Sequence, residues 1–177
     1  MLKIQKFTSL LTKEEINNLF YNYDLFLNNS FYIIDKKTKE YNEDNHTPDF
    51  KTHVEKLKKA SSEGCTIVVK NMENFNNKIK EIAEELGHGT DTHLYLVFNS
   101  TTGDSFGWHT DDRSVWVKMI YGEKLFGIKS YANETMFINY IRIKDNECLF
   151  IGKKEHKAIP MGISAMLSFG LPNQEDV

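Results

Sequence analysis

Two histidines and one aspartate in this chain have the residue types and the spacing of a metal-binding triad. His109 and Asp111 lie two residues apart, and His156 follows much later in the sequence. Side chains two apart on a strand point to the same face, so the first pair is able to share one ion. Two imidazoles and one carboxylate on one face of an octahedron hold non-haem Fe(II) and leave positions open for a co-substrate and dioxygen. The spacing therefore predicts iron redox chemistry, with His109, Asp111 and His156 as metal ligands and catalytic residues.

The sequence around both histidines predicts strands. An apolar, β-branched run at 115–121 follows the first histidine closely. Similar segments at 148–151 and 165–169 lie on either side of His156. We therefore expect both imidazoles at the margins of strands in a β-rich C-terminal half.

A structural interpretation competes with metal binding for these residues. A histidine and an aspartate close in sequence often form a buried hydrogen-bonded pair, and the first two residues alone favour that reading. Asp112 is a rival carboxylate, but on a regular strand it would point to the opposite face. The distant His156 and the flanking strands favour iron. We expect the remaining histidines, which have no partner at ligand spacing, at the surface or in caps: His46, His53, His88 and His93.

Helices precede the strands. Thr12 and Glu15 have the spacing of a capping box, which predicts that a helix begins there. Further helices are expected from about residue 47 to Gly64 and over 73–86, where apolar residues recur at helical spacing. Short strands are expected near 32–34 and 66–69.

This order predicts an α+β fold in one domain spanning residues 1–177. Residues 1–90 are expected to form a mainly helical N-terminal support. Residues 91–177 are expected to form a double-stranded β-helix core, or jelly roll, that carries the metal site and has the N-terminal helices packed on it.

The composition is that of a water-soluble globular domain, with 40% hydrophobic and 27% charged residues. No apolar run reaches the length that crosses a bilayer, and the N-terminus lacks a secretory signal, so we expect no membrane association. Two cysteines without metal spacing, Cys65 and Cys148, indicate a reduced, cytoplasmic setting. A net charge of -3 argues against nucleic-acid binding. The oligomeric state is left open.

The stretch from His109 to Phe126 resembles the cupin-like JmjC group of Fe(II)/2-oxoglutarate-dependent oxygenases. Members carry H-x-D, an apolar strand, and then a glycine and a basic residue before an aromatic one, which here are Gly122, Lys124 and Phe126. The segment 168–171 is similar to the Ser-x-Gly-apolar ending that is common in the family's final strands. The resemblance covers roughly residues 94–171 and implies a cupin jelly roll.

The chain departs from the family pattern in two places. Met119 stands where members often have a polar residue, and residues 152–155 replace a turn that is proline-rich in many members. These departures bear on the subfamily and the substrate more than on the metal.

The resemblance implies a hydroxylase that uses Fe(II), 2-oxoglutarate and O2, and it assigns Lys124 to the far carboxylate of 2-oxoglutarate. An unpaired charge is costly to bury, so that carboxylate needs a cation. Lys118 is an alternative partner for this carboxylate, because strand parity puts it on the same side as Lys124 if no bulge intervenes. Met166 stands where other oxygenases of this superfamily have an arginine, and this favours Lys124.

Further residues are candidates for the co-substrate site. Tyr95 could donate its hydroxyl group to the co-substrate, and Ser168 and Thr102 are weaker candidates for the same role. Trp108 and Trp116 either line the pocket or pack in the core.

The function expected from the sequence is hydroxylation of a C–H bond in an amino acid, a peptide or protein side chain, or a small metabolite. The expected partner is therefore a small-molecule or peptide substrate. Two alternatives stay open: a metal-dependent cupin enzyme that does not use 2-oxoglutarate, and a non-catalytic cupin binding module.

Overall fold

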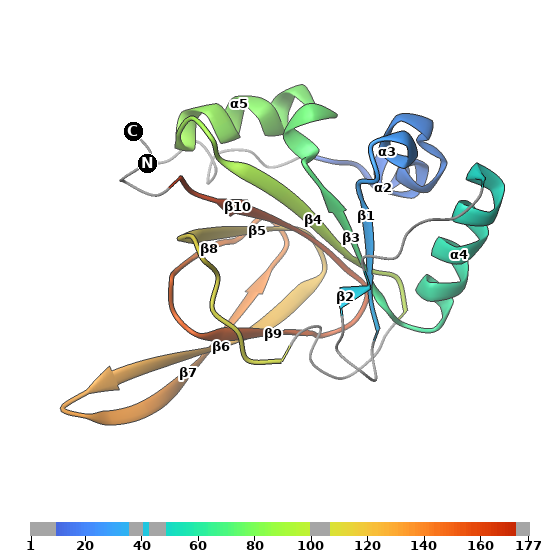
Figure 1. The fold of residues 1–177 in the computed structure, drawn as a ribbon. Coiled ribbons are helices and arrows are strands. Elements are labelled where there is room, and N and C mark those ends of the chain that lie inside the picture. The colour runs from blue at the N-terminus through green and yellow to red at the C-terminus, as the bar shows by residue number, and fades with distance from the viewer. Residues whose placement is uncertain (1–9, 36–40, 43–48, 100–106, 173–177) are drawn as a thin grey trace.

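A larger and a smaller antiparallel sheet face one another in the computed structural model, which describes residues 10–35, 41–42, 49–99 and 107–172. Helices cover the outer side of the larger sheet (Figure 1). The smaller sheet closes the other side, and one of its hairpins extends away from the body. Every described helix is too short or too polar to span a bilayer.

The larger sheet has seven strands among the described residues, in the order β2-β1-β3-β4-β10-β5-β8. All of its neighbouring strands run antiparallel. The first half of the chain therefore contributes strands as well as helices to this layer. The strand bounds are β1 Phe31–Ile34, β2 Tyr41–Asn42, β3 Thr66–Lys70, β4 Asp91–Val97, β5 Val115–Tyr121, β8 Cys148–Gly152 and β10 Ser164–Gly170.

The smaller sheet has the order β7-β6-β9, and its strands are β6 Glu123–Ala132, β7 Thr135–Lys144 and β9 His156–Pro160. The chain crosses from the larger to the smaller sheet between β5 and β6, and again between β8 and β9. Gly122 makes the first crossing with φ +75°, a conformation that favours glycine. This alternation between two facing sheets is the predicted jelly-roll arrangement, so the α+β class with a jelly-roll core is confirmed.

Strand β5 separates two apolar cores because its side chains alternate between faces. Val117 and Met119 pack with Phe126 in the core between the two sheets. Trp116 and Ile120 pack on the other side, in the core beneath the helices. The space between the sheets is the place where a site is able to form.

The first helical region begins as predicted and then breaks into short pieces. The Thr12 hydroxyl accepts from the Glu15 N–H (3.1 Å), and the Glu15 carboxylate accepts from the Thr12 N–H (2.7 Å), which confirms the capping box. Helix α2 (Lys13–Asn18) is followed by the 3-10 turn η1 (Leu19–Tyr21) and then by α3 (Tyr23–Leu27).

The two longer helices begin at side-chain caps. Asp49 caps α4 (Phe50–Ser62), which ends before Gly64. The expected helix over 73–86 is split into the 3-10 turn η2 (Met72–Asn74) and α5 (Asn77–Leu86). The side chain of Asn76 accepts backbone N–H groups at the start of α5, so a new helix begins there.

The expectation for His53 was wrong. Its side chain is 3% exposed and lies between the rings of Phe26 and Phe31, at centroid distances of 5.0 and 5.1 Å. It occupies the inner face of α4, and burial lowers its pKa. His93 is also not a surface or cap residue, because it is half-buried on β4. His88 is exposed as expected, and His46 lies outside the described residues.

Candidate metal centre

A backbone bridge brings the two histidines together. The His109 N–H donates to the His156 carbonyl oxygen at 3.0 Å, and the His156 N–H donates to the His109 carbonyl oxygen at 2.8 Å. The two imidazole rings lie side by side, with centroids 4.4 Å apart. His156 begins β9, whereas His109 makes only this isolated bridge and Asp111 has no regular structure. His156 therefore lies at the margin of a strand, as expected, whereas residues 109–111 form no regular strand and their side chains still converge.

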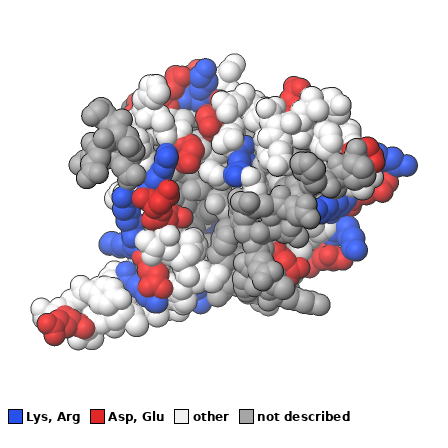
Figure 2. Space-filling model, in the orientation of Figure 1, with Lys and Arg blue, Asp and Glu red and all other residues white. Residues whose placement is uncertain are grey.

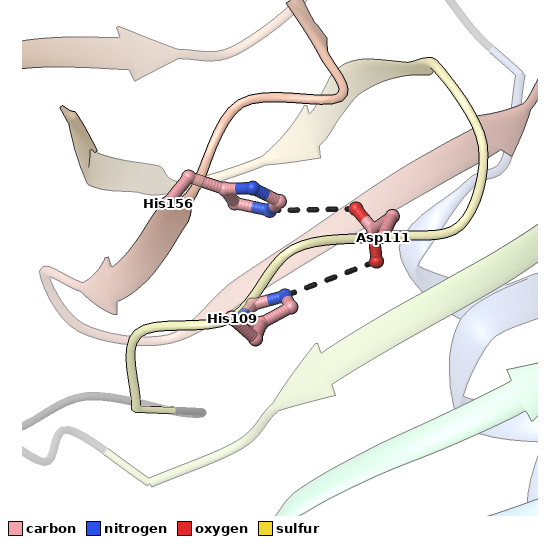
Figure 3. Close-up of side chains that lie close together, drawn as sticks. All are labelled: His109, Asp111 and His156. Atoms are coloured by element: carbon pink, nitrogen blue, oxygen red, sulfur yellow. Dashed lines mark ion pairs between the residues drawn. The ribbon is translucent and has the colours of Figure 1, made fainter. Parts of the chain in front are cut away.

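Asp111 completes the cluster from the segment that leads into β5 (Figure 3). Its two carboxylate oxygens lie 4.0 Å from His109 Nε2 and 3.6 Å from His156 Nε2. Both distances are too long for hydrogen bonds. One ligand atom from each of the three residues lies within 4.8 Å of the others. The three groups therefore surround a gap instead of closing it.

The hydrogen bonds of the imidazoles determine which nitrogen faces the gap. His109 Nδ1 lies 3.0 Å from the Gly107 carbonyl oxygen, and His156 Nδ1 lies 2.9 Å from the Lys154 carbonyl oxygen. Only an N–H bonds to a carbonyl oxygen, so each Nδ1 carries a hydrogen and each Nε2 is the nitrogen that faces the gap. Burial lowers the pKa of His156 and favours its neutral form. Two imidazole nitrogens and a carboxylate face one another, and this donor set fits a divalent cation.

The triad forms one wall of a cavity between the two sheets. The empty space there is about 410 Å³, including the part that opens to solvent. Tyr95, Lys124 and Ser168, the residues expected around a co-substrate, all line this cavity. The apolar lining of the cavity was not predicted, although alternation along the strands that carry it could have indicated it. These lining residues are Val115, Val117, Phe126, Ala158 and Met166.

Lys124 is a buried cation, and the described residues give it no counter-charge. Its side chain is 0% exposed, and its Nζ has no hydrogen-bond partner among the described residues. The ammonium lies 5.6 Å from the centroid of the Tyr95 ring. Burial lowers the pKa of Lys124 to about 8. A buried donor of this kind is costly unless a ligand satisfies it, so the cavity is suited to an anion.

Lys118 does not share this environment. Its Nζ donates to the Asn146 carbonyl oxygen at 3.0 Å and lies 3.7 Å from Cys148 Sγ, away from the cavity. Parity would put Lys118 on the same side as Lys124 only if no bulge intervened, and this condition is not met. The register of β5 with β10 shifts between Met119 and Tyr121, and the chain then turns at Gly122 into a different sheet.

The remaining candidates lie away from the cavity or beyond the described residues. Trp108 packs outside the smaller sheet, beneath the ammonium groups of Lys129 and Lys157 at 4.8 and 5.2 Å. Trp116 packs against Phe150 at 5.0 Å and does not line the cavity. Asp112 is exposed. Thr102 lies outside the described residues.

Comparison with solved structures identifies the fold. No protein-family model matches the sequence, and neither does any curated protein. The Escherichia coli ribosomal oxygenase YcfD, in a structure with cobalt and succinic acid, aligns with 96% of this chain and 46% of its own at 12% identity and a TM-score of 0.60. Another YcfD structure aligns over the same shares at 11% identity and a TM-score of 0.61. A cupin-superfamily protein from Desulfitobacterium hafniense aligns with 48% of this chain and 68% of its own at 13% identity and a TM-score of 0.37.

The core is a double-stranded β-helix, or jelly roll. This likeness covers nearly the whole chain, while the chain spans about half the length of YcfD. At this identity it establishes the fold and leaves the chemistry to the site itself.

Proposed function

We propose that this protein is an Fe(II)- and 2-oxoglutarate-dependent oxygenase that hydroxylates a C–H bond. The observation that carries the proposal is the pairing of two features in one cavity. A set of three metal donors lies on its wall, and the ammonium of Lys124, which has no hydrogen-bond partner in the described part of the chain, is buried beside it. A dicarboxylate with a metal-chelating end and a free far end would satisfy both.

His109, Asp111 and His156 would hold the metal, and the other cavity residues would receive the co-substrate. Bound Fe(II) would supply the activation of O2 that is coupled to conversion of 2-oxoglutarate to succinate and CO2. Lys124 would pair with the far carboxylate, and Tyr95 and Ser168 would offer hydroxyl groups to it. Apolar lining residues such as Val117 and Phe126 would exclude water from the reacting atoms.

The YcfD structure supports the proposal by analogy, because that oxygenase contains cobalt and succinic acid. For the substrate we propose an amino acid, a peptide or protein side chain, or a small metabolite. The net charge of -3 argues against a nucleic-acid substrate.

Succinate formation tests this function. Protein purified without oxygen and supplied with Fe(II), 2-oxoglutarate and O2 should release succinate, and His109→Ala should abolish the release. His88→Ala is the matched control, because His88 is an exposed histidine outside the cavity. Succinate release that persisted in His109→Ala would contradict the assignment of His109 as a ligand.

Binding of N-oxalylglycine, a mimic of 2-oxoglutarate, separates the proposal from the alternatives. With Mn(II) present, the mimic should raise the melting temperature of the wild type, and Lys124→Met should remove most of the rise. Metal binding without any effect of the mimic would indicate a cupin enzyme that does not use 2-oxoglutarate. Absence of metal binding would indicate a binding module.

A further inference from the structure

The β6–β7 hairpin presents a long apolar surface outside the jelly roll. It projects from the body of the molecule (Figure 1), and residues 131–142 are all exposed. Large apolar side chains lie on both faces of the hairpin: Tyr131, Met136, Phe137, Ile138, Tyr140 and Ile141. A surface of this kind on both sides of an exposed strand indicates an interaction site.

Strand β7 is also an open edge. Its only neighbour among the described strands is β6, and its other side has no strand partner there. Edge strands are usually protected by charged residues, proline or bulges. Residues 135–141 contain no charge and no proline, and the register with β6 runs from Glu123 to Ala132 without a shift. This edge is therefore able to pair with another strand.

The charges at the two ends of β7 complement each other. Glu134 lies in the turn at the tip of the hairpin, and Arg142 and Lys144 lie near its base. Figure 2 shows acidic atoms at the tip and an uncharged stretch along the hairpin. The base also carries Glu123, opposite Lys144, and Glu147, which accepts from the Lys144 N–H. An antiparallel pair of two β7 strands would place each Glu134 beside a lysine of the other copy.

We propose that two copies of this chain associate through β7, antiparallel about a two-fold axis that passes through Asn139. In this register Glu134 lies opposite the partner's Lys144. At the centre, Phe137 lies opposite the partner's Ile141, and Ile138 lies opposite the partner's Tyr140. The two smaller sheets then form one continuous sheet across the dimer, and cross-strand pairs of this kind are favourable.

The ion pair of Arg142 selects this register over its neighbour. Arg142 already contacts the Glu123 carboxylate at 2.6 Å. A shift of the axis to Ile138 would place Glu134 opposite the partner's Arg142, which is committed to Glu123. With Asn139 on the axis, Glu134 meets the partner's Lys144 instead. The inference depends on the hairpin alone and is independent of the proposed chemistry.

A disulfide test reads the register directly. Opposite residues of an antiparallel pair have Cα atoms about 4.5–5.5 Å apart, within the range of a disulfide. Asn139→Cys should therefore give a covalent dimer under mild oxidation. Ile138→Cys is the matched control, since the two introduced thiols would lie on diagonal positions about 7–8 Å apart. The wild type, with buried Cys65 and half-buried Cys148, sets the background.

A charge exchange tests the contact between tip and base. By analytical ultracentrifugation, the wild type should show a monomer–dimer equilibrium. Glu134→Lys should raise its dissociation constant by about tenfold, because two ion pairs per dimer become repulsive. The double variant Glu134→Lys with Lys144→Glu should restore the wild-type constant. Glu81→Lys, an equal change of charge on the exposed side of α5, should leave it unchanged.

Three results would overturn the proposal. The first is a wild type that stays monomeric at high concentration or forms open-ended aggregates. The second is crosslinking at position 138 as efficient as at position 139. The third is dimerisation that is insensitive to Glu134→Lys or is not restored in the double variant.

Discussion

Lys124 lies in an environment that opposes its chemical preference. Its ammonium is fully buried and meets no acceptor among the residues that the structure describes, so it destabilises the folded protein when no ligand is bound. The triad indicates that the cavity binds a metal cation, whereas the buried ammonium of Lys124 indicates that it also binds an anion. Two predictions follow from its lowered pKa.

Removal of this charge should stabilise the ligand-free protein at neutral pH. The pKa of Lys124 falls from 10.5 to about 8 on folding, so the unfolded chain holds this proton more tightly. The free-energy cost of burying the charged ammonium is fully present below pH 8 and decreases as pH rises from about 8 to 10.5. Lys124→Met should raise the free energy of unfolding by up to about 3 kcal/mol at pH 7, and by less at pH 10.

Urea denaturation at the two pH values measures this effect, with Lys118→Met as the control. The Lys118 ammonium donates to the Asn146 carbonyl oxygen, so its removal loses this hydrogen bond and should destabilise the protein. A Lys124→Met variant that is less stable than the wild type at pH 7 would show that the ammonium has a partner in solution.

Binding of a dicarboxylate should depend on the same proton. Only the ammonium form of Lys124 attracts a carboxylate, and its pKa is about 8 in the ligand-free protein. The affinity for N-oxalylglycine, measured by calorimetry with Mn(II) present, should therefore fall as pH rises above about 8. Binding below that pH should take up little or no proton at this residue. The affinity of Lys124→Met should be weak and flat over the same range, and an unchanged pH profile would contradict the role of Lys124.

At the scale of elements, the crossing from β5 to β6 decides which lysine enters the cavity. Gly122 makes this crossing with positive φ, and a Cβ atom there would collide with the backbone oxygen of Ile163. Gly122→Ala should therefore destabilise the protein by more than about 2 kcal/mol and weaken N-oxalylglycine binding, because Lys124 follows the turn. Thermal unfolding measures the first effect. Gly107→Ala, where a Cβ would meet no atom within 4 Å, should unfold near the wild-type temperature.

Local signals in the sequence predicted the elements better than their arrangement. The capping box at Thr12 depends on neighbouring residues, and the apolar run of β5 is legible in any context, so both were predicted correctly. Side chains alternate between two faces only within one strand. The alternation of apolar and polar residues does not reveal that the chain changes sheet at Gly122. For that reason Lys118, which was the alternative to Lys124, does not reach the cavity.

The candidate site was predictable in its ligands and less so in its surroundings. Residue types and spacing pointed to the triad. The backbone bridge between His109 and His156 brings the ligands together, a role that the sequence suggested for a regular strand. The burial of His53 was not predictable from ligand spacing, because it depends on how α4 packs against Phe31. The outward position of Trp108 likewise depends on tertiary packing beside Lys129.

At the scale of the whole molecule, the triad joins two parts of the jelly roll. Asp111 lies in the segment before β5 of the larger sheet, and His156 begins β9 of the smaller sheet. A bound ion would therefore tie the two sheets together. Mn(II) at about a hundred times its dissociation constant should stabilise the wild type by about 2.7 kcal/mol, read as a rise in melting temperature. His156→Ala should abolish this rise, and His88→Ala should keep it; an equal rise in both would place the ion elsewhere.

The reciprocal backbone bonds between His109 and His156 make the three ligands unequal. The two imidazoles are carried by peptide groups bonded to each other, so a shift of either segment moves both rings together. The carboxylate has no such tie to its neighbours and reaches them across 3.6 and 4.0 Å. The ion would then exchange through rotation of the Asp111 side chain alone. The two imidazole nitrogens would stay in place as a preformed bidentate site for the next ion.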